Sequence, residues 1–241
     1  MPTNQTKKNV DRFNQDALAN NGYLYTTNAP YSAIKSNDRI SRAVIATIPA
    51  QTGCIIDLGC GDGVYTAEFA EAFPLAYIEA NDPAQEAIEM ATQRFPHITF
   101  RVANILDLAT QPTTLFDVAV IRGVIHHLSD NTQQLAIQNA RAIAKMLIVV
   151  EPNGNNPILK LIEKNSAYHI AHEEQSFTSE TLMSWCVAAG WKDVSVNYIG
   201  FVPFFFPEGL ARIIYFFQPV LERIPIINKY FSAQIVVVCR A

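Results

Sequence analysis

Three glycines at the end of an apolar run are the residues of this chain best suited to hold a ligand. Gly59, Gly61 and Gly63 follow Asp57 in the stretch I-I-D-L-G-C-G-D-G. Glycine lets the backbone adopt a positive φ and approach a bound molecule with no Cβ in the way. A helix predicted to begin directly after the third glycine would add free N–H groups and the positive end of its dipole. We therefore predict a ligand-binding loop at this turn.

The spacing of these glycines argues against a dinucleotide site. A dinucleotide-binding loop has the pattern G-x-G-x-x-G, in which a helix N-terminus holds the pyrophosphate. Here the pattern is G-x-G-x-G, preceded by Asp-Leu. The sequence therefore disfavours a dehydrogenase.

Seven short apolar runs alternate with segments of helical period, and together they must position this loop. The runs lie at residues 54–59, 76–81, 98–103, 116–121, 146–151, 194–201 and 233–240. Several are apolar almost throughout, as expected for strands covered on both faces. The alternation predicts an α/β fold with a doubly wound, mostly parallel seven-stranded sheet. In such a sheet the glycine turn lies at the carboxyl ends of the strands, where ligands bind.

Capping residues mark where helices begin and end. Asp82 and Pro83 predict an N-cap and the first residue of a helix. Thr178 opens another helix, and Gly190 stands just beyond its end. The segment 203–232 joins the last two strands, which predicts an antiparallel C-terminal edge hairpin that carries an inserted helix.

The run D-L-G-C-G-D-G resembles the first motif of the class I S-adenosylmethionine-dependent methyltransferases. Other segments agree: F-D-V-A-V-I-R-G-V-I-H-H resembles the fourth strand and its loop, and A-K-M-L-I-V-V-E-P-N-G the fifth strand. The resemblance extends from about residue 36 to residue 241. It implies the Rossmann-like methyltransferase fold and S-adenosylmethionine as cofactor. From a helical segment at 36–48 and the tyrosine-rich stretch before it, we predict an N-terminal helical cap over 1–50, followed by the cofactor-binding domain over 51–241.

The resemblance also implies a set of cofactor-binding residues. Asp82 would accept hydrogen bonds from both ribose hydroxyls, with Pro83 beside the adenine. Asn104 and Ile105 would bond and cover the adenine, although the family more often has Asp where Asn104 stands. Arg122 would lie beside the amino-acid group. The full predicted set is Asp57, Gly59, Gly61, Gly63, Asp82, Pro83, Asn104, Ile105 and Arg122.

Histidines are the candidates for a catalytic base. His169 and His172 lie between the fifth strand and the next helix, on the predicted ligand side of the sheet. A histidine with its ordinary pKa near 6.5 can take a proton from a phenol or a similar group. We interpret the pair at 126–127 as a packing and capping element of the family. A tyrosine cluster in the N-terminal segment is either core cover or a wall of the active site.

Composition excludes several other classes of protein. The 241 residues fit one domain, 49% are hydrophobic, and the net charge is −4 with no run of Lys or Arg. A weakly acidic chain lacks the positive surface of a nucleic-acid binder. The loop R-G-V-I-H-H also differs from the proline-rich motif of base-amino methylases. The four cysteines have no metal-ligand spacing, so we expect no metal.

The N-terminus has no apolar signal segment, and no apolar stretch reaches 18 residues. The sequence therefore predicts a cytoplasmic protein without a transmembrane segment. The function that fits best is methyl transfer from S-adenosylmethionine to a small, apolar or aromatic acceptor. The alternatives are a non-catalytic regulatory protein that binds the same cofactor, and a lipid or quinone methyltransferase at a membrane surface.

The segment 203–232 is the most apolar part of the chain. It contains one helical stripe that we interpret as core packing, formed by Leu210, Ile213, Ile214, Phe217, Val220 and Leu221. Its surplus apolar surface predicts a wall of the acceptor pocket, a homodimer contact or a peripheral membrane contact.

Overall fold

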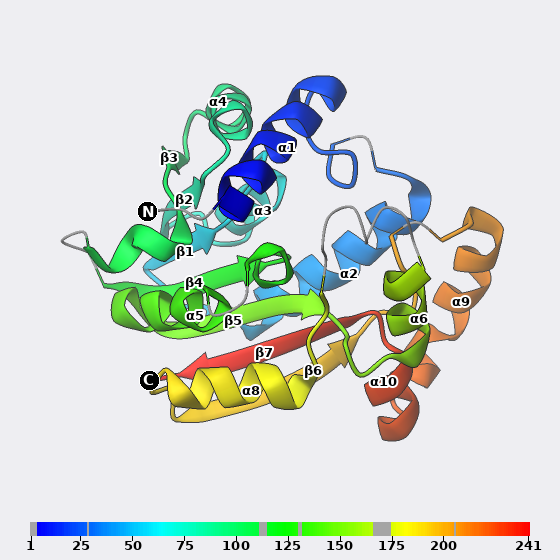
Figure 1. The fold of residues 1–241 in the computed structure, drawn as a ribbon. Helices are drawn as coiled ribbons and strands as arrows, with labels where there is room; N and C mark the ends of the chain where they lie inside the picture. The colour runs from blue at the N-terminus through cyan, green and yellow to red at the C-terminus, as the bar shows by residue number, and fades with distance from the viewer. Residues whose placement is uncertain (1–3, 28, 111–114, 130–131, 166–174, 205) are drawn as a thin grey trace.

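A seven-stranded sheet forms the centre of this computed structural model, which describes residues 4–27, 29–110, 115–129, 132–165, 175–204 and 206–241 (Figure 1). The strand order is β3-β2-β1-β4-β5-β7-β6, and only the pairs made by β7 are antiparallel. The strands are β1 (Cys54–Leu58), β2 (Tyr77–Asp82), β3 (Thr99–Val102), β4 (Phe116–Arg122), β5 (Ala144–Pro152), β6 (Asp193–Ile199) and β7 (Gln234–Arg240). The predicted fold class and the antiparallel edge hairpin are confirmed.

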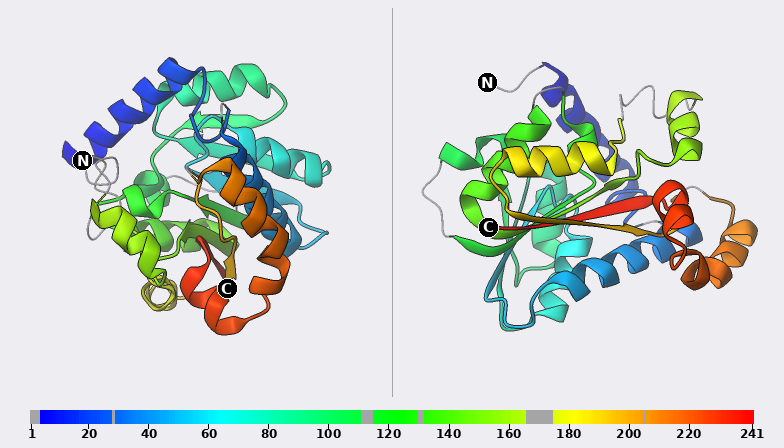
Figure 2. Two further views of the ribbon diagram at one scale, coloured as in Figure 1. Left: turned by 90° about the vertical axis from the view of Figure 1, so that its right-hand side faces the viewer. Right: turned by 90° about the horizontal axis from the view of Figure 1, so that it is seen from below.

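Helices cover both faces of the sheet (Figure 2). The α-helices are α1 (Asn4–Asn20), α2 (Tyr31–Thr47), α3 (Val64–Ala72), α4 (Gln85–Arg94), α5 (Thr132–Ile143), α6 (Pro157–Asn165), α8 (Ser179–Ala188), α9 (Glu208–Leu221) and α10 (Pro225–Phe231). Two short 3-10 helices, η1 (Ile105–Thr110) and η2 (Ile125–His127), follow β3 and β4. None of the helices in the described ranges has both the length and the apolar composition that crossing a membrane requires.

The sheet separates two hydrophobic cores, which explains why its central strands are apolar on both sides. Ile56 and Leu147 pack under α5 and α8, whereas Ile55 and Ile148 pack under α2 and α3. Successive side chains of a strand point to opposite faces. A strand that is buried on both faces therefore needs apolar residues at successive positions. It does not show the alternation of apolar and polar residues that marks a half-exposed strand.

Two local predictions were wrong. Helix α4 begins at Gln85, and its N-cap position is Ala84, because the Asp82 carboxylate instead accepts a hydrogen bond from the Ala84 N–H at 2.8 Å. In α9 the apolar stripe predicted to be core faces solvent: Leu210 is 54% exposed and Phe217 is 52% exposed. The buried residues of that helix are Ala211 and the polar Gln218. By contrast, Thr178 caps α8 as predicted, accepting from the Thr181 N–H.

Candidate active site

The glycine loop leaves β1 and enters α3 in a conformation that requires glycine. Gly59, Gly61 and Gly63 have φ of +82°, +55° and +76°, a backbone region that residues other than glycine rarely adopt. The loop is also closely packed: a Cβ added to Gly59 would lie 2.3 Å from a methyl group of Val124. Because these glycines have positive φ and no side chain, the chain that leaves β1 can pack closely against the ends of β2 and β4.

Asp82 ends β2 and fixes the glycine loop against the start of α4. Its Oδ2 accepts a hydrogen bond from the Gly61 N–H at 3.0 Å, and its Oδ1 accepts one from the Ala84 N–H. Burial raises the pKa of Asp82 to about 6, although these two backbone N–H groups act in the opposite direction. A carboxylate has about four lone-pair positions, so two further donors can still be accepted.

Asp57 is the second buried acid at this edge of the sheet. The Thr66 hydroxyl donates a hydrogen bond to its Oδ2 at 2.6 Å. Burial raises the pKa of Asp57 to about 6, whereas the Thr66 hydrogen bond and the nearby Arg122 guanidinium lower it. The ends of β1 and β2 therefore present two carboxylates that are charged at neutral pH and poorly hydrated.

Arg122, at the end of β4, places a shielded positive charge near Asp57. It donates hydrogen bonds to the Ser41 hydroxyl at 2.8 Å and to Asn37 Oδ1 at 2.9 Å. Its guanidinium carbon lies 3.5 Å from the centre of the Tyr65 ring, a cation–π contact. Burial lowers the pKa of Arg122 from its ordinary value. A shielded guanidinium with mostly neutral partners is suited to an anionic group of a ligand.

Asp62, inside the glycine loop, ties the N-terminal segment to the site. Its Oδ2 accepts hydrogen bonds from the Tyr23 N–H at 3.0 Å, the Thr26 hydroxyl at 2.6 Å and the Thr27 hydroxyl at 2.7 Å. The Tyr23 ring then covers the loop, because a Cβ on Gly61 would lie 2.5 Å from its Cε2. Burial and the neighbouring Asp82 carboxylate raise the pKa of Tyr23. Asp62 was not among the predicted site residues, although an acid between two loop glycines was a visible signal.

Glu151, at the end of β5, holds the loop that follows β4. Its Oε1 accepts hydrogen bonds from the N–H groups of Val124 at 3.0 Å and Ile125 at 2.8 Å. Its Oε2 lies 2.6 Å from His126 Nδ1. Glu151 is fully buried, so the backbone of η2 and the His126 ring supply its hydrogen bonds in place of water. No motif in the sequence pointed to this role of Glu151.

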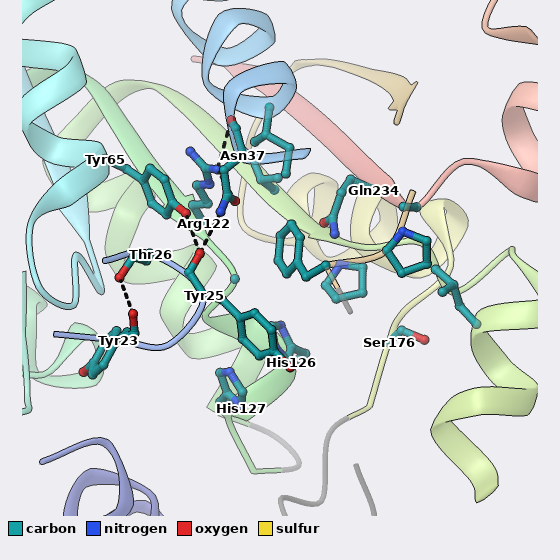
Figure 3. Close-up of a pocket in the computed structure, with 18 of the residues that line it drawn as sticks. Tyr23, Tyr25, Thr26, Asn37, Tyr65, Arg122, His126, His127, Ser176 and Gln234 are labelled. Carbon is teal, nitrogen blue, oxygen red and sulfur yellow. Dashed lines mark hydrogen bonds between the residues drawn. The ribbon is translucent and has the colours of Figure 1, made fainter. Parts of the chain in front are cut away.

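A cavity of about 380 Å³ lies at the carboxyl ends of the strands (Figure 3). The N-terminal helices and segment supply part of its wall, including Phe13, Tyr23 and Tyr25. Arg122, His126 and His127 line it from the end of β4 and η2, and Leu159, Ile162 and Phe204 close it from α6 and from the chain before α9. Most of the lining is therefore aromatic or aliphatic.

The predicted cofactor residues converge at this end of the sheet but differ in their access to the cavity. Arg122 lines the cavity, whereas Asp57 and Asp82 are buried next to the loop that Tyr23 covers. Asn104 Oδ1 accepts from the Leu106 N–H, and Ile105 packs into the core beneath α5. Pro83 is half-buried before α4. His169 and His172 lie outside the described residues.

These residues fit S-adenosylmethionine in three respects. Asp82 can accept two hydroxyl groups in addition to its backbone donors, the glycine loop admits close backbone approach, and Arg122 offers a cation to a carboxylate. The Tyr23 ring lies on Gly61, with its polar tip beside Asp82. The ring therefore covers the part of the loop that a ligand would approach. No group of three His, Cys, Asp or Glu side chains within the described ranges is arranged to hold a metal ion.

Comparison with known proteins gives a family match over the loop and the first four strands. A family model described as a methyltransferase domain matches residues 55–146. The chain is 28% identical over 130 residues to an uncharacterized methyltransferase of Mycobacterium tuberculosis, covering 52% of this chain and 60% of that protein. It is 30% identical over 135 residues to a trans-aconitate 2-methyltransferase of Mycolicibacterium gilvum, covering 56% and 50%. The matches thus span about half to three fifths of these curated relatives.

Solved structures match over nearly the whole chain. The magnesium protoporphyrin IX methyltransferase of Synechocystis, solved with bound S-adenosylmethionine, superposes with a TM-score of 0.66 at 12% identity, covering 100% of this chain and 99% of that chain. A possible histamine N-methyltransferase of Thermotoga maritima gives 0.61 at 17% identity, covering 98% and 97%. The fold is that of the S-adenosylmethionine-dependent methyltransferases, and the resemblance to this family is confirmed.

Proposed function

We propose that this chain transfers a methyl group from S-adenosylmethionine to a small acceptor with an apolar or aromatic body. The observation that carries the proposal is that two features lie side by side at one end of the sheet. One is the glycine loop with its buried acids, and the other is a largely apolar cavity of about 380 Å³ that begins at Arg122. The first suits a methyl donor and the second suits an acceptor beside it.

The polar residues of the site divide the recognition of the donor between them. Asp82 would accept the two ribose hydroxyls, as the family resemblance implies. Asp57 and the backbone of the glycine loop would face the ammonium of the amino-acid group, and Arg122 its carboxylate. This arrangement matches both charges of the amino-acid group with opposite, poorly hydrated charges of the protein. Tyr23 would turn aside from Gly61, or form the edge of the nucleoside site.

When bound, S-adenosylmethionine supplies a methyl group on a positively charged sulfur. The task of the protein is then to align the acceptor in line with the bond that breaks and to exclude water. The aromatic and aliphatic cavity walls serve both needs, because they enclose an apolar acceptor and leave few polar groups to hold water.

An acceptor that attacks through a hydroxyl oxygen must also lose a proton. Among the described residues we assign this task to His126, which lines the cavity and whose Nδ1 is fixed by Glu151 at 2.6 Å. A carboxylate in that place orients the ring and stabilises its protonated form. His169 and His172 stay a prediction.

The cavity walls support a small-molecule acceptor, and they do not single out one compound. Related proteins are named for acceptors as different as trans-aconitate and malonyl-acyl carrier protein. The aromatic side chains of Phe13, Tyr25 and Phe204 favour a flat or aliphatic acceptor in this chain.

Turnover tests the proposal against the non-catalytic alternative. The purified chain is incubated with S-adenosylmethionine and a panel of phenols, aliphatic acids and quinols, and the formation of S-adenosylhomocysteine is followed. We expect turnover with at least one apolar acceptor and its reduction in His126→Gln. Tight binding of S-adenosylhomocysteine without turnover on any acceptor would favour a regulatory binding protein.

A further inference from the structure

Helix α9 attaches to the body of the molecule through polar groups and leaves its apolar side uncovered. On its inner side the Tyr215 hydroxyl donates to the Ser32 carbonyl at 3.1 Å, and Gln218 Oε1 accepts from the Phe201 N–H at 3.3 Å. Glu222, directly after the helix, accepts from the Gly200 N–H at 3.0 Å and pairs with Arg39. This is the reverse of an ordinary surface helix, whose apolar stripe faces the core.

The uncovered side continues from α9 into α10 as one run of exposed apolar residues. We call it the α9–α10 face. It consists of Leu210, Ile213, Phe216, Phe217, Val220, Ile224, Ile226, Tyr230 and Phe231, with exposed fractions from 42% to 78%. Phe216 and Phe217 form an edge-to-face pair at 5.1 Å. Soluble monomers rarely expose a large contiguous apolar patch, and those that do usually use it for binding.

The segments around this face carry a small excess of positive charge. The segment 203–232 and helix α6 each carry one net positive charge, although the whole chain carries −4. Two of the three acids of these segments point inward: Glu222 to the Gly200 N–H, and Glu163 to the backbone and hydroxyl of Ser176. The third, Glu208, is exposed. The cations of the same segments are Lys160, Lys164, Arg212, Arg223 and Lys229. Three of them pair with carboxylates: Lys160 with Glu163, Arg212 with the exposed Glu208, and Lys229 with the exposed Glu180. Lys164 and Arg223 make no ion pair among the described residues and supply the excess positive charge. An apolar and aromatic surface rimmed by Lys and Arg complements the interface of an anionic lipid bilayer.

The face lies at the cavity end of the molecule. Helices α6, α9 and α10 gather beyond the carboxyl ends of the parallel strands (Figures 1 and 2). Helix α6 presents Leu159 and Ile162 to the cavity, whereas Ile158 and Leu161 are exposed by 54% and 64%. Apolar side chains thus extend from the cavity wall to the outer surface of the same end.

We propose that the α9–α10 face docks this protein on the surface of an anionic phospholipid membrane. The apolar side chains would enter the boundary between headgroups and acyl chains, and the surrounding lysines and arginines would contact lipid phosphates. Docking would place the cavity end toward the bilayer; that a membrane-held acceptor then enters the cavity rests on the proposed function. A second copy of the chain would bury the same apolar residues but would gain nothing from anionic lipid.

Vesicle flotation tests the proposal on the full chain without cofactor. The probes are vesicles of phosphatidylcholine alone and of phosphatidylcholine with phosphatidylglycerol. We expect the chain to float with the anionic vesicles and to be partly released by salt. Phe216→Glu and Ile226→Glu should each weaken binding about tenfold or more, because a large apolar side chain leaves the interface.

Leu75→Glu is the matched control, since Leu75 is 98% exposed but lies before β2, at the opposite end of the sheet. It should bind vesicles as the wild type does. Equal weakening by Leu75→Glu and Phe216→Glu, or no binding of the wild type, overturns the proposal. Analytical ultracentrifugation that shows a dimer abolished by Phe216→Glu, with no vesicle binding, assigns the face to a second copy instead.

Binding of S-adenosylhomocysteine by each variant separates this proposal from the proposed function. Retained binding also demonstrates that a variant is folded. If the ligand binds and vesicles do not, docking is wrong and methyl transfer stands. If vesicles bind and the ligand does not, the proposed function fails and the docking surface stands.

Discussion

Asp82 combines a structural task with a proposed binding task. Its two oxygens hold the Gly61 and Ala84 N–H groups, so the carboxylate shapes the loop before any ligand arrives. Loss of the whole side chain would therefore disturb the loop as well as the ligand. Asn in its place keeps the size of the side chain but has only one acceptor oxygen, so one of the two backbone hydrogen bonds is lost together with the charge. A stability measurement beside the binding measurement separates the two tasks.

Asp82→Asn should weaken S-adenosylhomocysteine binding about tenfold to a hundredfold, because charge-assisted hydrogen bonds contribute roughly 1.5–3 kcal/mol each. Calorimetry measures the affinity, and thermal unfolding checks the fold. Asp117→Asn is the control, because Asp117 also accepts two backbone hydrogen bonds, from Gly53 and Cys54, but at the far end of β4. Unchanged affinity in Asp82→Asn would refute the ribose assignment.

The raised pKa values of Asp57 and Asp82 predict a pH dependence of binding. Both are about 6 in the folded protein, against an ordinary value of 3.8. The folded state holds these protons more tightly than the unfolded state does, so the two acids lower the free energy of unfolding as pH rises from about 4 to about 6. Ligand affinity changes in the opposite direction.

Because the charged form of Asp82 accepts the ribose hydroxyls, the affinity for S-adenosylhomocysteine should rise as pH increases through about 6 and level off near neutrality. Calorimetry across this range measures it. Asp82→Asn should show a shallower rise, with Asp57 alone contributing. An affinity that is flat in the wild type would contradict a direct role for the carboxylates.

At the scale of elements, the N-terminal segment is part of the site because Asp62 holds it there. Asp62→Ala would leave the Tyr23 N–H and two threonine hydroxyls without their shared acceptor. We expect the free energy of unfolding to fall by about 2–4 kcal/mol. We also expect faster chymotrypsin cleavage at Tyr23 and Tyr25.

Asp38→Ala is the comparison for Asp62→Ala, because Asp38 makes an exposed ion pair with Arg42. That pair should contribute less than about 1 kcal/mol. If both substitutions have the same small effect, Asp62 does not hold the segment in place.

Helix α9 gives an element-scale test of whether its apolar stripe is surface or core. Phe217→Ala should change the free energy of unfolding by no more than about 0.5 kcal/mol, as for other exposed positions. Leu182→Ala in α8, where the side chain is fully buried, should cost about 2–5 kcal/mol. Chemical denaturation measures both. If Phe217→Ala lowers the free energy of unfolding about as much as Leu182→Ala does, the apolar stripe of α9 is packed in the core.

At the scale of the whole molecule, the sheet could be predicted because its signal is local. Each apolar run corresponds to a strand. Burial on both faces selects apolar residues along the central strands, whereas the edge strand β6 alternates exposed and half-buried positions. Helix α1 was missed because few of its residues are apolar; it attaches through Phe13 and Ala17, which pack against α4. The face that α9 turns outward was also unpredictable, because periodicity identifies an apolar side of a helix but not what covers it.

The site was predictable only where a motif carried it. The glycines, Asp57 and Asp82 follow from the loop pattern, which specifies backbone conformation and strand ends. Asp62 and Glu151 act through partners distant in sequence, and a buried acid looks like any other acid in a single chain. Their roles emerge only when the fold brings their donors together.

Calorimetric titration of the chain with S-adenosylhomocysteine and with NAD tests the central claim most directly. The glycine spacing, the two buried acids and Arg122 predict one site for S-adenosylhomocysteine with an affinity in the micromolar range, and no binding of NAD. Binding of NAD without binding of S-adenosylhomocysteine would contradict the assignment of this site to a methyl donor.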